Sequence, residues 1–207
     1  MAAPEDIATL SQYVPPPVAE PLLDCINYHQ AALKISRSRT TKLGDYRPPV
    51  QGKPHRITVN HDLNKYAFMV TLVHEIAHMT NWVKHKNSVK PHGQEWKNEF
   101  KALMQPFLNT DIFPQDVLTA LKSYMANPAA SSCTDPHLLR TLKKYDDGPA
   151  PIYLEELPPN TLFTINKKKV FRKGQQLRKR FKCLEVNTQR YYLIHPMAEV
   201  IPVENLV

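Results

Sequence analysis

Two histidines and a glutamate lie close together in the segment His74-Glu75-Ile76-Ala77-His78. Residues four apart lie one above the other on one face of a helix, so His74 and His78 can present two imidazoles to one metal ion. Glu75 then lies beside the open position of that metal. On a helix, this spacing predicts a zinc site with a carboxylate that can act as a general base.

The residues before this segment support a buried helix, because residues 66–73 are apolar nearly all round. Two imidazoles and a carboxylate are costly in such a helix unless something binds them. With zinc bound, a water can be activated, and Glu75 can take its proton and pass it to the leaving amine of a peptide bond. In the alternative interpretation, His74 and His78 are surface or hydrogen-bonded core residues and Glu75 is solvated.

Catalytic zinc usually takes three protein ligands, and the downstream candidates are His85, His92, Glu95 and Glu99. His85 follows His78 by seven residues, about 10 Å along a continuing helix, which is too far to share the ion. Glu99 has close to the separation of the third ligand in thermolysin-like enzymes. His92 lies just before a helix predicted over residues 94–105, and Pro91 and Gly93 allow the chain to turn back there.

The segment HEIAH, followed by a short loop and His92-Gly93-Gln94-Glu95-Trp96, resembles the SprT-like metallopeptidase family, whose relatives include the Spartan proteases. Residues 39–46 and 55–60 are similar to that family's strand pair before the active-site helix, and the resemblance covers residues 24–108. It implies that His92 is the third ligand. It also implies an α+β fold, a zincin-like helical metallopeptidase domain with a small antiparallel sheet.

The sequence departs from this family in its cysteines. Many SprT-like proteins carry a second zinc in a C-terminal ribbon, but Cys25, Cys133 and Cys183 are isolated here and no CxxC occurs. A site with four thiolate ligands cannot be built from three cysteines. We therefore expect a different C-terminal module.

The chain divides into four parts by its pattern of proline, glycine and apolar residues. We expect a poorly ordered, proline-rich lead-in over residues 1–17, a metallopeptidase domain over 18–146, a linker over 147–159 and a small all-β, barrel-like module over 160–207.

Within the metallopeptidase domain, apolar spacing predicts a first helix over residues 18–37, and polar side chains at 60–62 are expected to cap the metal helix. Strands are predicted over 42–46 and 56–59, and further helices over 114–126 and 135–145. In the C-terminal module we predict strands over 161–165, 169–172, 177–186, 190–194 and 199–202, with Asn166-Lys167 in a turn.

Positive charge is concentrated in the C-terminal module. Residues 160–207 hold ten Lys and Arg against three Glu, a net charge of +7, whereas the rest of the chain holds 17 against 16. Such cations, interleaved with Phe171, Phe181, Tyr191 and Tyr192, are typical of single-strand DNA or RNA binding. Alternatively, the cations form a solvated face and the aromatic residues form the core. The candidate cations are Lys167, Lys168, Lys169, Arg172, Lys173, Arg178, Lys179, Arg180 and Lys182.

Taken together, the sequence predicts a zinc metallopeptidase with one Zn²⁺ per chain and a protein or peptide substrate, with nucleic-acid-associated proteins as one candidate class. Mn²⁺ or Fe²⁺ can also occupy His-rich sites. There is no membrane-spanning stretch, no secretory signal and no disulfide framework, which favours the cytoplasm; no pattern indicates an oligomeric state. Two other functions stay open. One is a non-catalytic nucleic-acid-binding or adaptor protein with structural zinc, and the other is a zinc hydrolase of small molecules.

Overall fold

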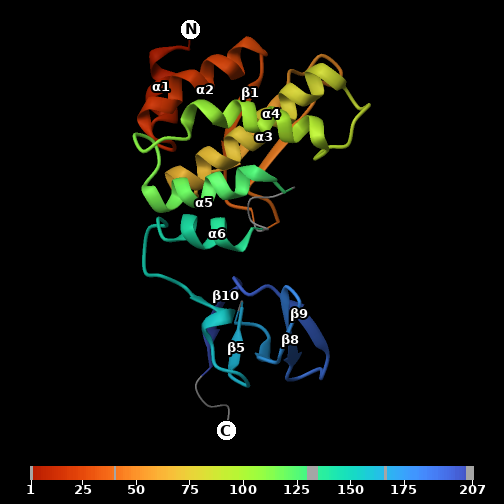
Figure 1. Cartoon of the computed structure of the whole chain (residues 1–207). Helices are drawn as coiled ribbons and strands as arrows, with labels where there is room; N and C mark the ends of the chain where they lie inside the picture. Colours follow the sequence, from red (N-terminus) through yellow and green to blue (C-terminus); the bar gives the residue numbers. More distant parts are fainter. Residues whose placement is uncertain (1, 40, 130–134, 166, 204–207) are drawn as a thin grey trace. The chain divides into compact units, whose positions relative to one another are not determined.

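The computed structural model describes residues 2–39, 41–129, 135–165 and 167–203, so Cys133 and Asn166 lie outside the described residues. The chain forms two compact units, residues 1–147 and 148–207, and each is described by itself (Figure 1). No helix in the described ranges is long and apolar enough to cross a membrane.

Unit 1 is built around the helix α3 (Lys65–His85), whose residues from Phe68 to Ala77 are all buried. Asn64 caps its first turn, because its side-chain oxygen accepts hydrogen bonds from the backbone N–H groups of Tyr66 and Ala67. The predicted cap at residues 60–62 was therefore placed too early. The side-chain nitrogen Nδ2 of Asn64 donates to the carbonyl of Leu142, and this bond connects the start of α3 to the last helix of the unit.

The sheet of unit 1 consists of β1 (Ala32–Ser36), β2 (Gly44–Arg47) and β3 (Arg56–Asn60) in the order β1-β3-β2. β2 pairs with β3 antiparallel, but β1 pairs with β3 in parallel, so the predicted antiparallel sheet is in fact mixed. The predicted helix over 18–37 was too long. The helix α2 (Pro16–Tyr28) ends at Tyr28, and the alternating segment Ala32-Leu33-Lys34-Ile35-Ser36 has the period of a strand.

The first residues do not match the predicted lead-in. Residues 4–10 form α1 (Pro4–Leu10), and Leu10 and Val14 are fully buried in the core of unit 1. The backbone N–H of Ala2 also donates to the Asp24 carboxylate. Apolar side chains at 10 and 14 thus give this segment a place in the core.

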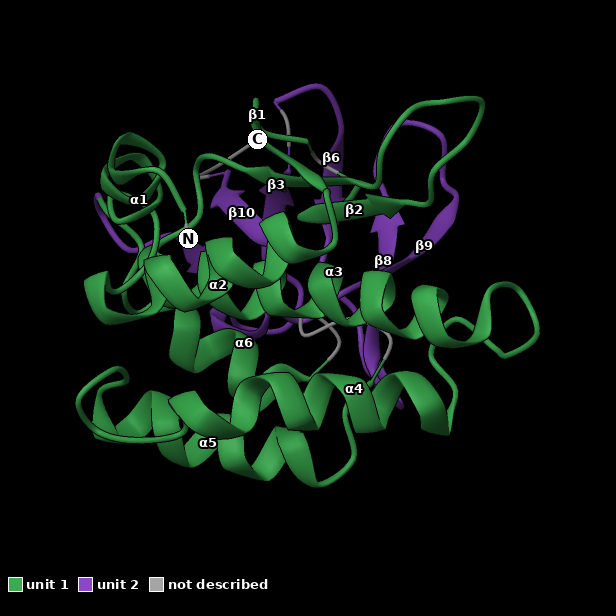
Figure 2. Ribbon diagram, turned by 90° about the horizontal axis from the view of Figure 1, so that it is seen from above, with its two compact units in different colours: residues 1–147 green, residues 148–207 purple. Residues whose placement is uncertain are grey.

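The remaining helices of unit 1 confirm the predictions over 94–105, 114–126 and 135–145. They are α4 (Gln94–Met104), followed by the short η1 (Gln105–Phe107), α5 (Gln115–Ala126) and α6 (Pro136–Lys143). Figure 2 shows α3 in the middle of unit 1, with the sheet on one side and α4 on the other. Trp96, Phe100 and Met104 are the buried residues of α4, which packs against α3.

Unit 2 is an open antiparallel sheet and not the expected barrel. Its strand order is β4-β10-β5-β6-β8-β7, with β9 paired to β8, and no pairing closes the two ends among the described residues. Four of the five predicted strands are confirmed, but the strand predicted over 177–186 is divided by a turn into β7 and β8. Part of the predicted linker is structured, because Leu154 and Leu157 enter the core of unit 2. The elements are β4 (Ile152–Tyr153), η3 (Leu154–Glu156), β5 (Leu162–Thr164), β6 (Val170–Arg172), β7 (Gln176–Leu177), β8 (Arg180–Glu185), β9 (Tyr191–Ile194) and β10 (Glu199–Pro202).

Candidate metal centre

Three histidine side chains converge beside α3. His74 and His78 come from consecutive turns of this helix, and His92 comes from the loop directly before α4. One nitrogen of each ring lies within 4.8 Å of the others. The Nε2 atoms of His74 and His78 are 3.1 Å apart, and the rings of His78 and His92 have centroids 4.6 Å apart. The structure therefore brings together the three residues that the sequence and the family resemblance selected.

Burial keeps these imidazoles neutral. Desolvation, with a smaller contribution from the neighbouring histidines, lowers the pKa of His74 and of His78 to about 3. Burial also lowers the pKa of His92. A metal ion binds the neutral form of imidazole, so at pH 7 the three rings already have the protonation state of ligands.

Hydrogen bonding among the three histidines does not satisfy all of their ring nitrogens, whereas a metal ion can bind one nitrogen of each ring. The Nε2 atom of His92 is buried and has no hydrogen-bond partner, although buried polar atoms normally have one. Three neutral imidazole nitrogens around one position are a suitable set for Zn²⁺, which leaves a further coordination position open. The arrangement can thus hold one metal ion.

Trp96 forms the wall behind the three histidines. Its ring centroid lies 4.7 Å from that of His74, 5.3 Å from that of His78 and 4.8 Å from that of His92. Trp96 is fully buried and stacks on Phe100 at 5.2 Å. From the sequence, Trp96 was identified only as part of the segment that resembles the SprT-like family. Its position in the first turn of α4, four residues after His92, is the signal that links it to the site.

Glu75 is buried between α3 and β2, with 7% of its surface exposed. The backbone N–H of Tyr46 donates to its carboxylate. Burial, and then the charge of Asp45, raise the pKa of Glu75 to about 8, against the opposing effect of the Tyr46 hydrogen bond. The Glu75 side chain is thus fixed against the edge of the sheet, one residue from a candidate ligand.

Gly44 makes room for this carboxylate. A Cβ atom at residue 44 would lie 2.5 Å from Oε1 of Glu75, and 2.8 Å from both Cγ of Glu75 and Cγ2 of Thr71. Only glycine fits without a shift. Sequence reasoning missed this role, because it depends on a contact between residues that are far apart in the chain.

A cleft of about 830 Å³ lies in front of the histidines. One side is formed by β2 and the residues before it, and β2 is an edge strand of the sheet. The other side is formed by the end of α3 and the loop that leads to His92. The residues that line the cleft are Thr41, Lys42, Leu43, Gly44, Asp45, Tyr46, Pro48, Thr71, His74, Glu75, His78, Asn81, Trp82, Lys86, Asn87, Val89, Pro91 and His92.

The alternative third ligand, Glu99, is engaged elsewhere. Its carboxylate oxygen Oε1 lies 2.6 Å from Nζ of Lys84, at the surface between α3 and α4. Neither Glu99 nor His85 belongs to the histidine group that the described residues form. The geometry therefore favours His92 over Glu99 as the third ligand.

The basic residues of unit 2 divide into two groups. Lys173 is buried, donates hydrogen bonds to the carbonyls of Glu155 and Leu157, and lies 4.3 Å from the centroid of the Phe181 ring. Its inclusion among the nucleic-acid-binding cations was therefore wrong, because its ammonium is used inside the unit. Phe171 and Phe181 also belong to the core. The other candidate cations lie at the surface, with Lys182 half-buried.

The family comparison covers the part of the chain that builds this centre. The model of the SprT-like family matches residues 24–116, which include α3, β1 to β3, α4 and all three histidines. No curated protein and no solved structure matches the chain significantly. The histidine cluster and the sheet beside it therefore lie in the region, residues 24–116, that matches the SprT-like family.

Proposed function

We propose that this protein is a zinc-dependent peptidase. The observation that carries the proposal is the convergence of three neutral imidazoles, whose ligand nitrogens lie within 4.8 Å of one another, in the cleft that Glu75 also lines. The SprT-like family, with its metallopeptidase kind of activity, supports the same function. His74, His78 and His92 would hold the ion.

Zn²⁺ in such a site supplies Lewis acidity, which acidifies a water and polarises a carbonyl group. Glu75 would accept the proton of the attacking water and later give it to the leaving amine. A cation beside a carboxylate lowers the pKa of that carboxylate, so Glu75 is expected to be more acidic in the metal-loaded protein than in the metal-free one. The Tyr46 N–H keeps the carboxylate oriented while it moves the proton.

The position of β2 favours an extended peptide as the substrate. An edge strand has one row of backbone N–H and C=O groups without a strand partner, and an extended chain can pair with it. β2 pairs with β3 on one side only, and its residues Gly44, Asp45 and Tyr46 line the cleft that contains the histidines. A peptide paired there would run past Glu75 and the metal site.

Replacement of Glu75 by Gln tests the proposed chemistry. The amide has nearly the same shape but cannot accept the proton, so we expect stoichiometric zinc and a loss of cleavage of an unfolded, fluorescein-labelled casein by at least about 100-fold. Glu99→Gln is the matched control and should keep both zinc and cleavage. Equal cleavage by the wild type and Glu75→Gln would contradict the role of Glu75 as the general base. No cleavage by the zinc-loaded wild type would contradict a peptidase and would favour a structural zinc site.

A further inference from the structure

One face of the sheet in unit 2 leaves apolar and aromatic side chains exposed in the described ranges. In the paired strands, Arg172 lies opposite Leu184, Leu184 opposite Tyr191, and Lys182 opposite Leu193. Side chains directly opposite each other point to the same face, and neighbours along a strand point to opposite faces. We call the outer face the set Val170, Arg172, Arg180, Lys182, Leu184, Tyr191 and Leu193 from β6, β8 and β9.

The opposite face is the core of the unit, so the two faces have different roles. Phe171, Phe181, Cys183 and Ile194 alternate with the outer residues and are buried. On the outer face, by contrast, Tyr191 is 63% exposed and Leu193 is 56% exposed. Of the four aromatic residues proposed for base stacking, Phe171 and Phe181 are buried, Tyr192 packs against the core, and Tyr191 has an exposed ring.

One cation lies over this ring, other cations share its face, and no acid accompanies them. Nζ of Lys182 lies 4.2 Å from the centroid of the Tyr191 ring. Arg172 on β6 and Arg180 at the start of β8 are exposed on the same face. No Asp or Glu occurs among the outer-face residues of β6, β8 and β9. The face therefore presents positive charge and a ring without any internal neutralisation.

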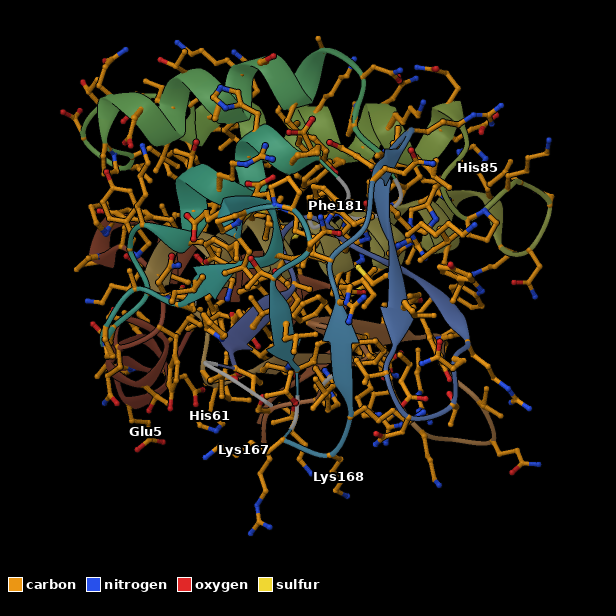
Figure 3. The ribbon with its side chains drawn as sticks, turned by 90° about the horizontal axis from the view of Figure 1, so that it is seen from below. Glu5, His61, His85, Lys167, Lys168 and Phe181 are labelled. Carbon is orange, nitrogen blue, oxygen red and sulfur yellow. The ribbon has the colours of Figure 1, made fainter. Side chains whose placement is uncertain are left out.

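Further cations extend the charge beyond both ends of β8. Arg178 and Lys179 form the turn between β7 and β8, next to Arg180. Lys167 and Lys168 lie in the turn between β5 and β6, and Figure 3 shows both side chains pointing away from the ribbon. The six residues of β8 span about 17 Å, at about 3.3 Å per residue, so the cations form a row along β8 and are not gathered at one point. We call this row the track; it consists of Lys167, Lys168, Arg172, Arg178, Lys179, Arg180 and Lys182.

We propose that the outer face binds single-stranded nucleic acid. The cations of the track would contact successive phosphates, and the exposed Tyr191 ring would stack on an unpaired base. A single strand fits better than a duplex, because the bases of a duplex are stacked on each other and cannot cover a ring on a flat sheet. This inference is independent of the metal site and of the proposed peptidase activity.

The test measures binding of the full chain to fluorescein-labelled 20-nucleotide DNA and RNA strands, and to duplex DNA, by fluorescence anisotropy at several salt concentrations. We expect both single strands to bind more tightly than the duplex. Tyr191→Ala should weaken single-strand binding about 10-fold, whereas Tyr191→Phe, which keeps the ring, should bind as the wild type does. If Tyr191→Ala weakens binding of the RNA strand more than binding of the DNA strand, or the reverse, the strand with the larger loss is the preferred nucleic acid.

Charge removal provides the matched comparison. Arg172→Gln with Lys182→Gln should weaken binding and reduce the slope of log K against log salt by about 1.4, which is about 0.7 for each lost phosphate contact. Lys53→Gln with Lys122→Gln removes the same charge from exposed positions of unit 1 and should leave binding unchanged. Circular dichroism of each variant checks that the fold is kept.

Several results would overturn the proposal. These are the absence of single-strand binding at 50 mM salt, a duplex preference, equal losses in the two double variants, and an unchanged affinity in Tyr191→Ala. Competition by poly-glutamate as effective as competition by unlabelled single strand would assign the face to an acidic protein instead.

Discussion

Substitution of Gly44 by alanine tests the contact between β2 and Glu75. The added Cβ would meet Oε1 of Glu75 at 2.5 Å, whereas ordinary contacts begin at 3.4 Å, so the carboxylate would have to move by about 0.9 Å. Inserting a methyl group into a packed site typically costs 1–3 kcal/mol. Glycine is also a poor strand residue, so without the collision Gly44→Ala would be neutral or slightly stabilising.

Urea unfolding of the metal-free protein, followed by circular dichroism, measures this cost. We expect Gly44→Ala to lower the free energy of unfolding by about 2 kcal/mol. In a Glu75→Ala background two of the three close atoms are gone, so the cost should fall by at least about 1 kcal/mol. Costs that agree within about 0.5 kcal/mol in the two backgrounds would refute the predicted collision with Glu75.

The same variant bears on catalysis. A displacement of about 1 Å in a catalytic group can reduce a rate by about 100-fold. The three atoms nearest to the added Cβ belong to Glu75 and Thr71, so Gly44→Ala should keep its zinc while peptide cleavage falls by about this factor. Loss of zinc together with activity would mean that the substitution disturbs the ligands and not only the carboxylate.

Three further predictions concern the metal centre and unit 2. Trp96→Ala removes the ring that contacts all three histidines; it should lower the free energy of unfolding by about 3–5 kcal/mol and weaken zinc binding in a chelator competition, whereas Trp96→Phe should keep most of both. In the metal-free folded protein the pKa values of His74 and His78 are lowered to about 3, so below pH 6.5 the unfolded chain binds more protons than the folded one. These two histidines therefore make the free energy of unfolding fall on acidification. The pKa of Glu75, raised to about 8, has the opposite effect, because the folded protein binds this proton more tightly than the unfolded chain does. Near pH 5 these three groups give a net slope of about 1.4 kcal/mol per pH unit, which Glu75→Gln should steepen to about 2.7; an unchanged slope in urea titrations would count against the buried carboxylate. Lys173→Gln should destabilise unit 2 in thermal unfolding without changing the salt slope of nucleic-acid binding, since the Lys173 ammonium bonds two carbonyls inside the unit; a changed slope would return Lys173 to the binding surface.

Local patterns predicted those parts of the site that lie within one element. The apolar run before His74 identified α3, and the four-residue spacing placed His74 and His78 on one face of it. His92 required the family resemblance, because spacing alone left Glu99 open. The lysine at residue 84 that holds Glu99 comes from a different helix, and no local pattern reveals that pairing.

Contacts between distant segments account for most of what the sequence did not reveal. The parallel pairing of β1 with β3 joins segments that a long connection separates, so residues 32–36 looked like the end of a helix. Lys173 looked like its neighbouring surface cations, but its neighbours in space are the carbonyls of Glu155 and Leu157. The close approach of Gly44 to Glu75 is of the same kind.

The most direct test of the central claim is elemental analysis of the purified protein after zinc loading, with the wild type beside His92→Ala and Glu99→Ala. We predict one zinc ion per chain in the wild type and in Glu99→Ala, and its loss in His92→Ala. No stoichiometric zinc in the wild type, or a loss in Glu99→Ala with retention in His92→Ala, would contradict the three-histidine centre.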